Sequence, residues 1–208
     1  IAPAPVAKRG MGAGGVIASL YSMDIALPPI LALGTKAQKE RYIPPVLAGE
    51  KIAALAITEP NGGSDVANLQ TRAVLDGDDY VVNGQKAFIT SGIQADFYTV
   101  AVRTGDKGLN GISLLLIEKN TPGFEQQALQ KMGWRSSDTA MLFFQNCRVP
   151  KANLLGVENM GFMGIMMNFN AERLGLAVQA CGLARVCLEQ SVEYAKNRKT
   201  FGKPLIKH

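Results

Sequence analysis

Cysteine is scarce in this sequence, and no two cysteines stand at short spacing. The three present, Cys147, Cys181 and Cys187, are odd in number and form no Cys-x-x-Cys motif. Disulfide frameworks and structural zinc sites are built from such pairs, so the sequence argues against both. This use of cysteine favours a reducing compartment.

Histidine is scarcer still, because His208 is the only one. A polyhistidine metal site is therefore excluded within this chain, and we expect no metal. A histidine-based catalytic triad would have to use the last residue of the sequence, which makes that chemistry a poor candidate.

Long apolar runs and dense runs of charge are also missing. No apolar run approaches the roughly 20 residues that cross a bilayer, so we expect no membrane span. The net charge is +5 over 208 residues, but the basic residues are scattered, which is typical of a solvated surface and argues against nucleic acid as a partner. A hydrophobic content of 47% with 19% charged residues indicates a globular protein with a buried core.

Helix-type patterns occupy both ends of the chain. Residues 1–50 are predicted to form helical pieces broken by prolines, one over residues 16–27 before the prolines at 28–29 and one ending near those at 44–45. Thr35 is expected to cap the second piece, and Gln38 to complete a capping box. From Gly161 onward, apolar residues again recur at helical spacing.

Strand-type patterns fill the middle of the chain from about residue 51. The hairpin signals are Asp76-Gly77-Asp78-Asp79 and Asn83-Gly84. The expected strands cover residues 52–57, 73–75, 80–82, 86–90, 96–103, 112–118 and 140–144. Several short strands without intervening helices predict an α+β protein whose strands form an antiparallel barrel or sandwich.

Residues 10–15, Gly-Met-Gly-Ala-Gly-Gly, satisfy the GxGxxG pattern of dinucleotide-binding folds. That fingerprint requires a preceding buried strand and a parallel βαβ series. The proline-rich residues 3–9 are a poor strand, and no such series follows. A glycine-rich helix entrance is the better interpretation.

The most specific stretch is Ala56-Ile57-Thr58-Glu59-Pro60-Asn61-Gly62-Gly63-Ser64-Asp65-Val66, directly after the first expected strand. Pro60 and the two glycines indicate a loop. Backbone N–H groups, small side chains and the hydroxyls of Thr58 and Ser64 are suited to holding a polar cofactor or a phosphate at a strand end. On composition alone, an ordinary turn is an equally good interpretation.

Taken whole, this stretch resembles the flavin-contacting signature of the acyl-CoA dehydrogenases. The family's other motifs follow as Phe88-Ile89-Thr90-Ser91-Gly92, Lys131-Met132-Gly133-Trp134-Arg135-Ser136, Cys147-Arg148-Val149-Pro150, Asn153-Leu154-Leu155-Gly156 and Arg198-Lys199-Thr200-Phe201-Gly202-Lys203. The resemblance covers nearly all of the chain. It implies the end of an N-terminal helical domain at residues 1–50, an antiparallel β-barrel middle domain at 51–155 closed near residues 153–156, and the start of a C-terminal helical domain at 156–208. We therefore expect this chain to be a fragment of a longer protein.

The resemblance also implies FAD as the cofactor. Thr58 would bond to the flavin ring, and Thr90 would place a second hydroxyl near its reactive nitrogen. Phe88 stands where the family commonly has tryptophan, so it offers an apolar cover without an indole N–H. Arg198 and Thr200 would bind the FAD of a neighbouring subunit, as charge-assisted pairing to phosphate predicts for the arginine. The implied cofactor-binding residues are Leu55, Ile57, Thr58, Gly63, Ser64, Phe88, Ile89, Thr90, Arg198, Thr200 and Phe201.

Glu172 is the candidate catalytic base. An acid beside a base on a helix usually marks a solvated face, but Glu172-Arg173-Leu174 resembles the isovaleryl-CoA and long-chain branches, whose catalytic glutamate lies on this helix. Most other branches place the acid near the C-terminus instead. The implied substrate-binding residues are Ser64, Phe162, Asn170 and Arg173.

The implied reaction is the FAD-dependent α,β-dehydrogenation of an acyl-CoA thioester to a trans-2-enoyl-CoA, with electrons passed to an electron-transfer flavoprotein. The resemblance further implies a homotetramer built as a dimer of dimers, in the cytoplasm of a bacterium or in a mitochondrial matrix. An acyl-CoA oxidase, a flavin monooxygenase of the same fold and a non-catalytic flavin- or acyl-CoA-binding relative remain alternatives, although Glu172 and Ser64 count against the monooxygenase. The isolated chain is expected to have little activity.

Overall fold

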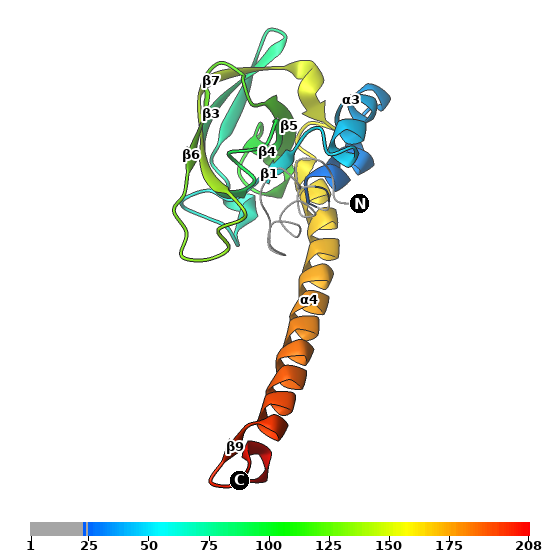
Figure 1. The fold of residues 1–208 in the computed structure, drawn as a ribbon. Coiled ribbons are helices and arrows are strands. Elements are labelled where there is room, and N and C mark those ends of the chain that lie inside the picture. The colour runs from blue at the N-terminus through cyan, green and yellow to red at the C-terminus, as the bar shows by residue number, and fades with distance from the viewer. Residues whose placement is uncertain (1–22, 24) are drawn as a thin grey trace. The chain divides into compact units, whose positions relative to one another are not determined.

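The structure of the chain is a computed structural model that describes Met23 and residues 25–208. It divides the chain into two compact units, one up to Asn168 and one from Phe169 to His208. The elements are labelled in Figure 1. The glycine-rich motif at residues 10–15 and most of the predicted helix at 16–27 lie outside the described residues.

The described part of the chain begins with a helix that contains two prolines. Residues 25–33 are helical, so the prediction that the prolines at 28–29 break the helix is wrong. Ala26 and Ile30 are completely buried and Leu27 nearly so. Packing of this apolar face therefore outweighs the poor helix propensity of proline.

Helix α3 (Lys36–Leu47) begins with the predicted capping box. The Oγ1 atom of Thr35 accepts from the Gln38 backbone N–H at 3.2 Å, and the Gln38 side chain accepts from the Thr35 backbone N–H at 2.9 Å. The Gln38 side-chain amide also donates to the carbonyls of Ala152 and Leu154. The cap therefore also fixes the helix to the segment at residues 152–154.

The middle of the chain forms one mixed sheet, and most of the predicted strands are confirmed within a residue or two. The strands are β1 (Ala53–Ala56), β2 (Arg72–Asp76), β3 (Asp79–Thr90), β4 (Phe97–Arg103), β5 (Ile112–Glu118), β6 (Phe124–Ala128), β7 (Thr139–Pro150) and β8 (Leu154–Leu155). Their order is β6-β7-β3-β2-β4-β5-β8, and β1 pairs with β4. The 3₁₀ helices η1 (Val66–Asn68), η2 (Leu109–Gly111) and η3 (Lys151–Asn153) lie in the connections.

The prediction of a closed antiparallel barrel is not supported. Among the described residues β6 pairs only with β7, and β8 pairs only with β5, so β8 extends the sheet rather than closing it. The sheet is also mixed, because β1 and β2 each pair with β4 in parallel. Parallel neighbours need a crossover connection, which the alternation pattern within a strand does not reveal.

The turn at Gly77 is confirmed, whereas the second predicted hairpin turn is wrong. Gly77 has φ 64° and joins β2 to β3, but Asn83 and Gly84 lie inside β3. The pairing of β3 with β7 shifts register between Val82 and Gly84, which marks a β-bulge. A Cβ atom at Gly84 would lie 2.7 Å from the Cα of Thr71, so glycine permits the close approach of this backbone. Long-range pairing with β7 therefore overrides the local Asn-Gly signal.

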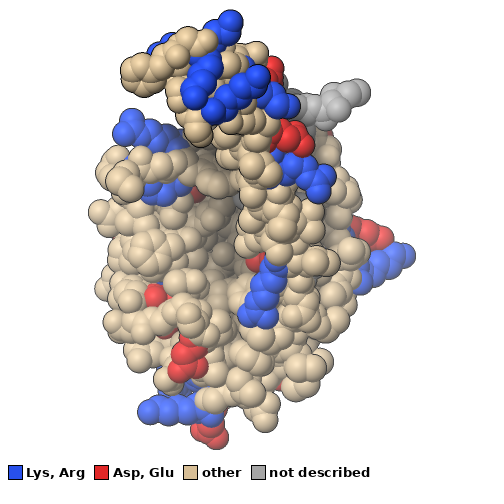
Figure 2. Space-filling view, turned by 90° about the horizontal axis from the view of Figure 1, so that it is seen from below, with Lys and Arg blue, Asp and Glu red and all other residues tan. Residues whose placement is uncertain are grey.

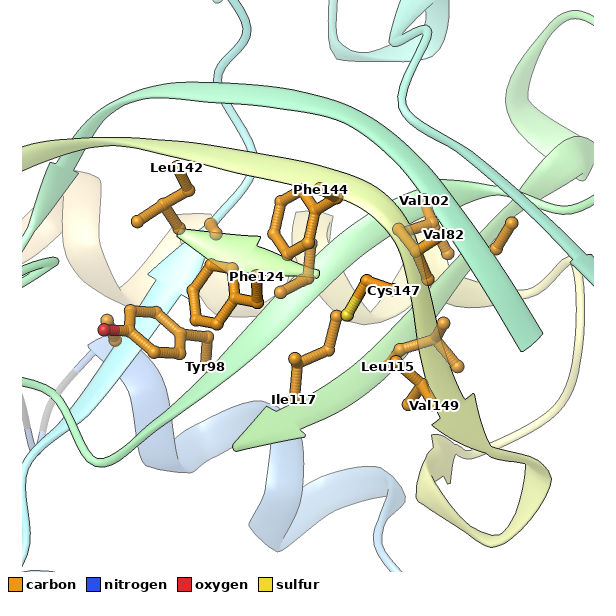
Figure 3. Close-up of a cluster of buried hydrophobic side chains, with 14 of the residues drawn as sticks. Val82, Tyr98, Val102, Leu115, Ile117, Phe124, Leu142, Phe144, Cys147 and Val149 are labelled. Carbon is orange, nitrogen blue, oxygen red and sulfur yellow. The ribbon is translucent and has the colours of Figure 1, made fainter. Parts of the chain in front are cut away.

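The main hydrophobic core lies between parts of the sheet that are distant in strand order. Figure 3 shows side chains of β7, such as Leu142 and Phe144, facing side chains of β4 and β5, such as Tyr98 and Ile117. The rings of Phe124 and Phe144 stack with centroids 4.9 Å apart. The sheet therefore curves around a core formed by side chains of its own strands. This core gives the loops at the strand ends a rigid support.

The second predicted helical region is confirmed. Helix α4 (Gly161–Asn197) begins in the first unit and runs on through the second. A two-stranded ribbon follows, with β9 (Lys199–Thr200) antiparallel to β10 (Lys203–Pro204), and η4 (Leu205–Lys207) comes after it. None of the helices in the described residues has the length and apolar character needed to cross a membrane.

Candidate functional site

Two strand ends that are distant in sequence meet at the signature loop. The Ala87 backbone N–H in β3 donates to the carbonyl of Thr58, just after β1, at 2.8 Å. Thr58 is half-buried, and Thr90, at the end of β3, is exposed. The structure therefore brings the segments that carry these two threonines into direct contact through Ala87 and Thr58.

The signature loop itself is a tight turn. The backbone groups of Glu59 and Gly62 bond reciprocally, at 2.9 and 3.1 Å. Beyond this turn Gly63 and Ser64 are exposed. A Cβ atom at Gly63 would lie 3.4 Å from the Cγ2 atom of Thr58, so the exposed backbone of Gly63 lies against that side chain.

The apolar residues predicted for cofactor binding fall into two groups. Phe88 has φ 59°, a left-handed conformation that is rare for an aromatic residue, and its side chain is 68% exposed. By contrast, Ile57 and Ile89 are buried and Leu55 is half-buried. Phe88 therefore offers an open apolar face, whereas the other three are wholly or partly enclosed by the fold.

Sequence reasoning missed a buried ion pair directly behind these residues. The Nζ atom of Lys86 donates to Glu59 Oε1 at 2.8 Å and to the Ile57 carbonyl at 3.0 Å. Lys86 is 0% exposed and Glu59 is 7% exposed. Because β3 also carries other polar residues, such as Asn83 and Gln85, nothing in the sequence marks Lys86 as buried.

Burial and charge act against each other on both members of this pair. Burial raises the pKa of Glu59, but the charge of Lys86 and the hydrogen bonds from Lys86, Thr71 and Gln70 outweigh it, so the pKa lies below its ordinary value. Burial lowers the pKa of Lys86 to about 8 in spite of the opposing carboxylate. Glu59 therefore stays ionised at neutral pH, held by the Lys86 ammonium and by two backbone N–H donors.

A second missed residue, Asp138, fixes the turn that follows Thr90. Its carboxylate accepts from the backbone N–H groups of Ile93 at 2.7 Å and Gln94 at 3.3 Å, and from the Gln94 side chain at 2.8 Å. Its backbone carbonyl accepts from the Ser91 N–H at 3.0 Å. The end of β3 is therefore anchored at both Lys86 and Ser91.

The candidate base lies in the second unit, on helix α4. Glu172 is partly buried, and this burial raises the pKa of Glu172 to about 7, against the opposing effect of Arg173. The Arg173 guanidinium lies over the ring of Phe169 at 5.6 Å, and Asn170 is exposed. A carboxyl group with this pKa can accept and release protons near neutral pH.

The remaining predicted residues lie on the same helix or after it. Phe162, near the start of α4, is half-buried and belongs to the first unit. In the second unit Arg198 is exposed, Phe201 is 97% exposed, and the Thr200 hydroxyl lies 3.1 Å from His208 Nε2. Arg198 and Phe201 are thus accessible at the end of α4.

The residues at the meeting strand ends fit a planar cofactor with a polar edge. Thr58, Ser64 and Thr90 supply hydroxyl groups, and Phe88 supplies an exposed aromatic face. Figure 2 shows lysine and arginine side chains among uncharged and acidic ones on the surface.

Three family models match successive parts of the chain. The acyl-CoA dehydrogenase N-terminal domain matches residues 6–50, the middle domain residues 54–147, and the C-terminal domain residues 159–208. Together they cover most of the sequence, in the order that the resemblance of its motifs implied.

Individual relatives agree with these matches. An acyl-CoA dehydrogenase of Bacillus subtilis is 45% identical over 200 residues, which are 95% of this chain and 52% of the relative. The structure of a probable acyl-CoA dehydrogenase from Mycobacterium abscessus is 57% identical with a TM-score of 0.90, over 95% of this chain and 53% of that one. Butyryl-CoA dehydrogenase from Megasphaera elsdenii is 42% identical with a TM-score of 0.87, over 93% of this chain and 52% of that one.

The chain thus spans about half the length of the relatives it matches. The signature loop, the strand end that meets it and the Glu-Arg pair on α4 lie in the matched parts. On these motifs, matches and fold, the chain belongs to the acyl-CoA dehydrogenase family.

Proposed function

We propose that the protein carrying this chain catalyses the FAD-dependent α,β-dehydrogenation of an acyl-CoA thioester to a trans-2-enoyl-CoA. The observation that carries the proposal is the contact between the loop at Thr58 and the end of β3, made through Ala87. It gathers hydroxyl groups and an open aromatic face at one place, in a chain that belongs to this family.

The strand ends are proposed to hold FAD. Thr58 and Thr90 would bond the polar edge of the flavin ring, and Phe88 would cover its face. Leu55, Ile57, Gly63, Ser64 and Ile89 would complete the wall, and Arg198, Thr200 and Phe201 would contribute from a neighbouring subunit. Bound FAD supplies the oxidant for the substrate's β-carbon hydride.

Glu172 is proposed to take the α-proton of the substrate. That proton is weakly acidic, so its removal needs a base whose pKa lies close to the working pH. Burial gives Glu172 such a pKa, about 7. Ser64, Phe162, Asn170 and Arg173 would contact the substrate, with Arg173 helping to place the thioester.

The proposal extends to organisation and partners. We propose an N-terminal helical segment over residues 1–50, a sheet domain over 51–155 and the start of a helical domain over 156–208. Electrons would pass to an electron-transfer flavoprotein, and the protein would assemble as a homotetramer. Its compartment would be a bacterial cytoplasm or a mitochondrial matrix.

Anaerobic titration of the purified protein with a panel of acyl-CoAs tests this function. We expect yellow flavin absorbance that bleaches on addition of a suitable acyl-CoA, and the panel defines the preferred chain length. A colourless protein that cannot be reconstituted with FAD would contradict the cofactor assignment. Stoichiometric peroxide production in air would favour the oxidase, and a yellow protein that no acyl-CoA bleaches would favour a non-catalytic relative.

A further inference from the structure

Lys86 and Glu59 form the most completely buried ion pair among the described residues. Their side chains are 0% and 8% exposed, whereas the arginine and the two aspartates of the ion pairs of Arg148 are at least 33% exposed. Neither member touches the face that the threonine hydroxyls and Phe88 present, since both lie inside the fold. The pair therefore acts on that face only through the backbone.

The contacts of Glu59 join three segments of the chain. One carboxylate oxygen accepts from the Gln70 N–H at 2.6 Å, and the other accepts from the Thr71 N–H at 2.8 Å and from Lys86 at 2.8 Å. Glu59 itself belongs to the signature loop, residues 70–71 lead into β2, and Lys86 lies in β3. Both carboxylate oxygens of Glu59 therefore hold the signature loop against the neighbouring segments.

Lys86 adds a second connection across the same junction. Besides Glu59, its ammonium donates to the carbonyl of Ile57, which is the residue before Thr58. The next residue along β3, Ala87, bonds the Thr58 carbonyl. Thr58 is therefore held on both sides, and Phe88 and Thr90 follow two and four residues after Lys86.

Stability alone is a weak reason for such a pair. Desolvating two charges offsets most of their attraction, so a well-packed apolar pair can stabilise a fold as well or better. A charged pair that bonds carbonyls and N–H groups of three segments has a further effect, because it permits only one placement of those segments. That placement sets the spacing between Thr58 and the end of β3.

We propose that Glu59 and Lys86 are positioning residues of the flavin site, which hold the loop of Thr58 at the correct distance from Phe88 and Thr90. This inference rests on the proposed function, because it presumes that FAD binds at these strand ends. It adds that cofactor affinity depends on two residues that do not touch the cofactor.

The first test measures FAD affinity and the visible flavin spectrum of the full protein with Glu59→Gln and with Lys86→Met. Glutamine keeps one oxygen, which replaces only one of the two carboxylate oxygens that accept from the Gln70 and Thr71 N–H groups, and it loses the charge. We expect the FAD dissociation constant to rise about tenfold or more in each variant, as for loss of a buried charged hydrogen bond, and the flavin bands to lose resolved structure. Arg148→Gln is the matched control, because it removes an exposed ion pair with Asp79 at the opposite end of the same strand and should leave both readouts unchanged.

The double variant Glu59→Gln/Lys86→Met separates positioning from general stabilisation. With no buried charge left unmatched, its melting temperature should recover toward that of the wild type. Its FAD affinity should stay low, because residue 86 then links β3 to neither the Ile57 carbonyl nor residue 59. Recovery of affinity together with melting temperature would overturn the inference, as would single variants that bind FAD like the wild type. Wild-type protein that binds no FAD would instead overturn the proposed function.

Discussion

Two partly or fully buried glutamates, one in each unit, show opposite shifts of pKa. Glu59 lies in the first unit, which contains the sheet. Its oxygens accept from the Lys86 ammonium and from two backbone N–H groups, and its pKa is lowered. Glu172 lies on α4, where burial outweighs the effect of Arg173, and its pKa is raised to about 7. When the surroundings of two carboxylates shift their pKa values in opposite directions, the two groups are suited to different roles. Glu59 is fixed as an anion that holds structure, and Glu172 is able to exchange a proton.

The largest effect should follow from removing the exchangeable carboxylate. Glu172→Gln should lower kcat with an acyl-CoA about 10³-fold, because the amide cannot take the α-proton. Bound flavin should remain, since Glu172 is not among the residues proposed to hold it. Stopped-flow flavin reduction measures the effect. A variant that reduces its flavin at a near-normal rate would place the base elsewhere.

Removing the charge at Glu59 should act on folding instead. Glu59→Gln should lower the free energy of unfolding by about 3 kcal/mol at pH 7, as expected when one member of a buried pair is removed. Because the folded-state pKa of Glu59 is depressed below 4.5, this difference should be present above pH 4.5 and lost as the pH falls further. Urea unfolding of both proteins from pH 7 to 3 measures it. A gap that stays constant to pH 3 would show that the charge of Glu59 does not stabilise the fold.

Because the pKa of Glu172 is raised, we expect kcat/KM for an acyl-CoA to fall at acidic pH. A base that titrates near pH 7 is protonated below that value, so kcat/KM should fall about tenfold for each pH unit below 7. The profile is measured with a substrate that does not titrate in this range. A profile that is flat from pH 7 down to pH 5 would contradict the assignment of Glu172 as the base.

The smallest effect comes from adding a single methyl group to the signature loop. At Gly63 the new Cβ would lie 3.4 Å from Thr58 Cγ2 and 3.9 Å from its hydroxyl, whereas at Gly62 it would meet only the Asp65 carbonyl, at 3.9 Å. Both contacts are of ordinary length, so the fold should not change, but the methyl group at residue 63 would stand beside Thr58 in the space proposed for FAD. Gly63→Ala should therefore weaken FAD binding by about tenfold, an effect of roughly 1.4 kcal/mol. Gly62→Ala is the matched control and should bind FAD like the wild type. Equal affinities for the two variants would remove Gly63 from the site.

Much of the fold could be predicted because the relevant signals are local. The capping box of Thr35 and Gln38 lies within one helical turn, and the hairpin at Gly77 lies within four residues. Strand β6 was missed because its sequence, Phe-Glu-Gln-Gln-Ala, is mostly polar. The parallel pairing of β1 with β4 was missed because it joins residues more than forty positions apart, such as Ala53 and Phe97.

The motifs of the candidate site could be recognised in the sequence, but the buried contacts that hold those motifs in place could not. Thr58 and Thr90 stand out because their flanking sequences resemble known signatures. Lys86 does not, because its partner Glu59 lies 27 residues away and a lysine in a strand usually faces solvent. Likewise, nothing near Asp138 in sequence shows that its carboxylate binds the turn after Thr90. Such contacts follow from the sheet's register, which only the complete fold determines.

The proposed placement of FAD at the two meeting strand ends is tested most directly by backbone hydrogen exchange of the protein with and without FAD. Bound cofactor should slow exchange in peptides covering residues 58–64 and 87–94, and leave the distant turn at Gly77 unchanged. Protection elsewhere in the sheet unit, with these two segments exchanging as they do without FAD, would contradict the account.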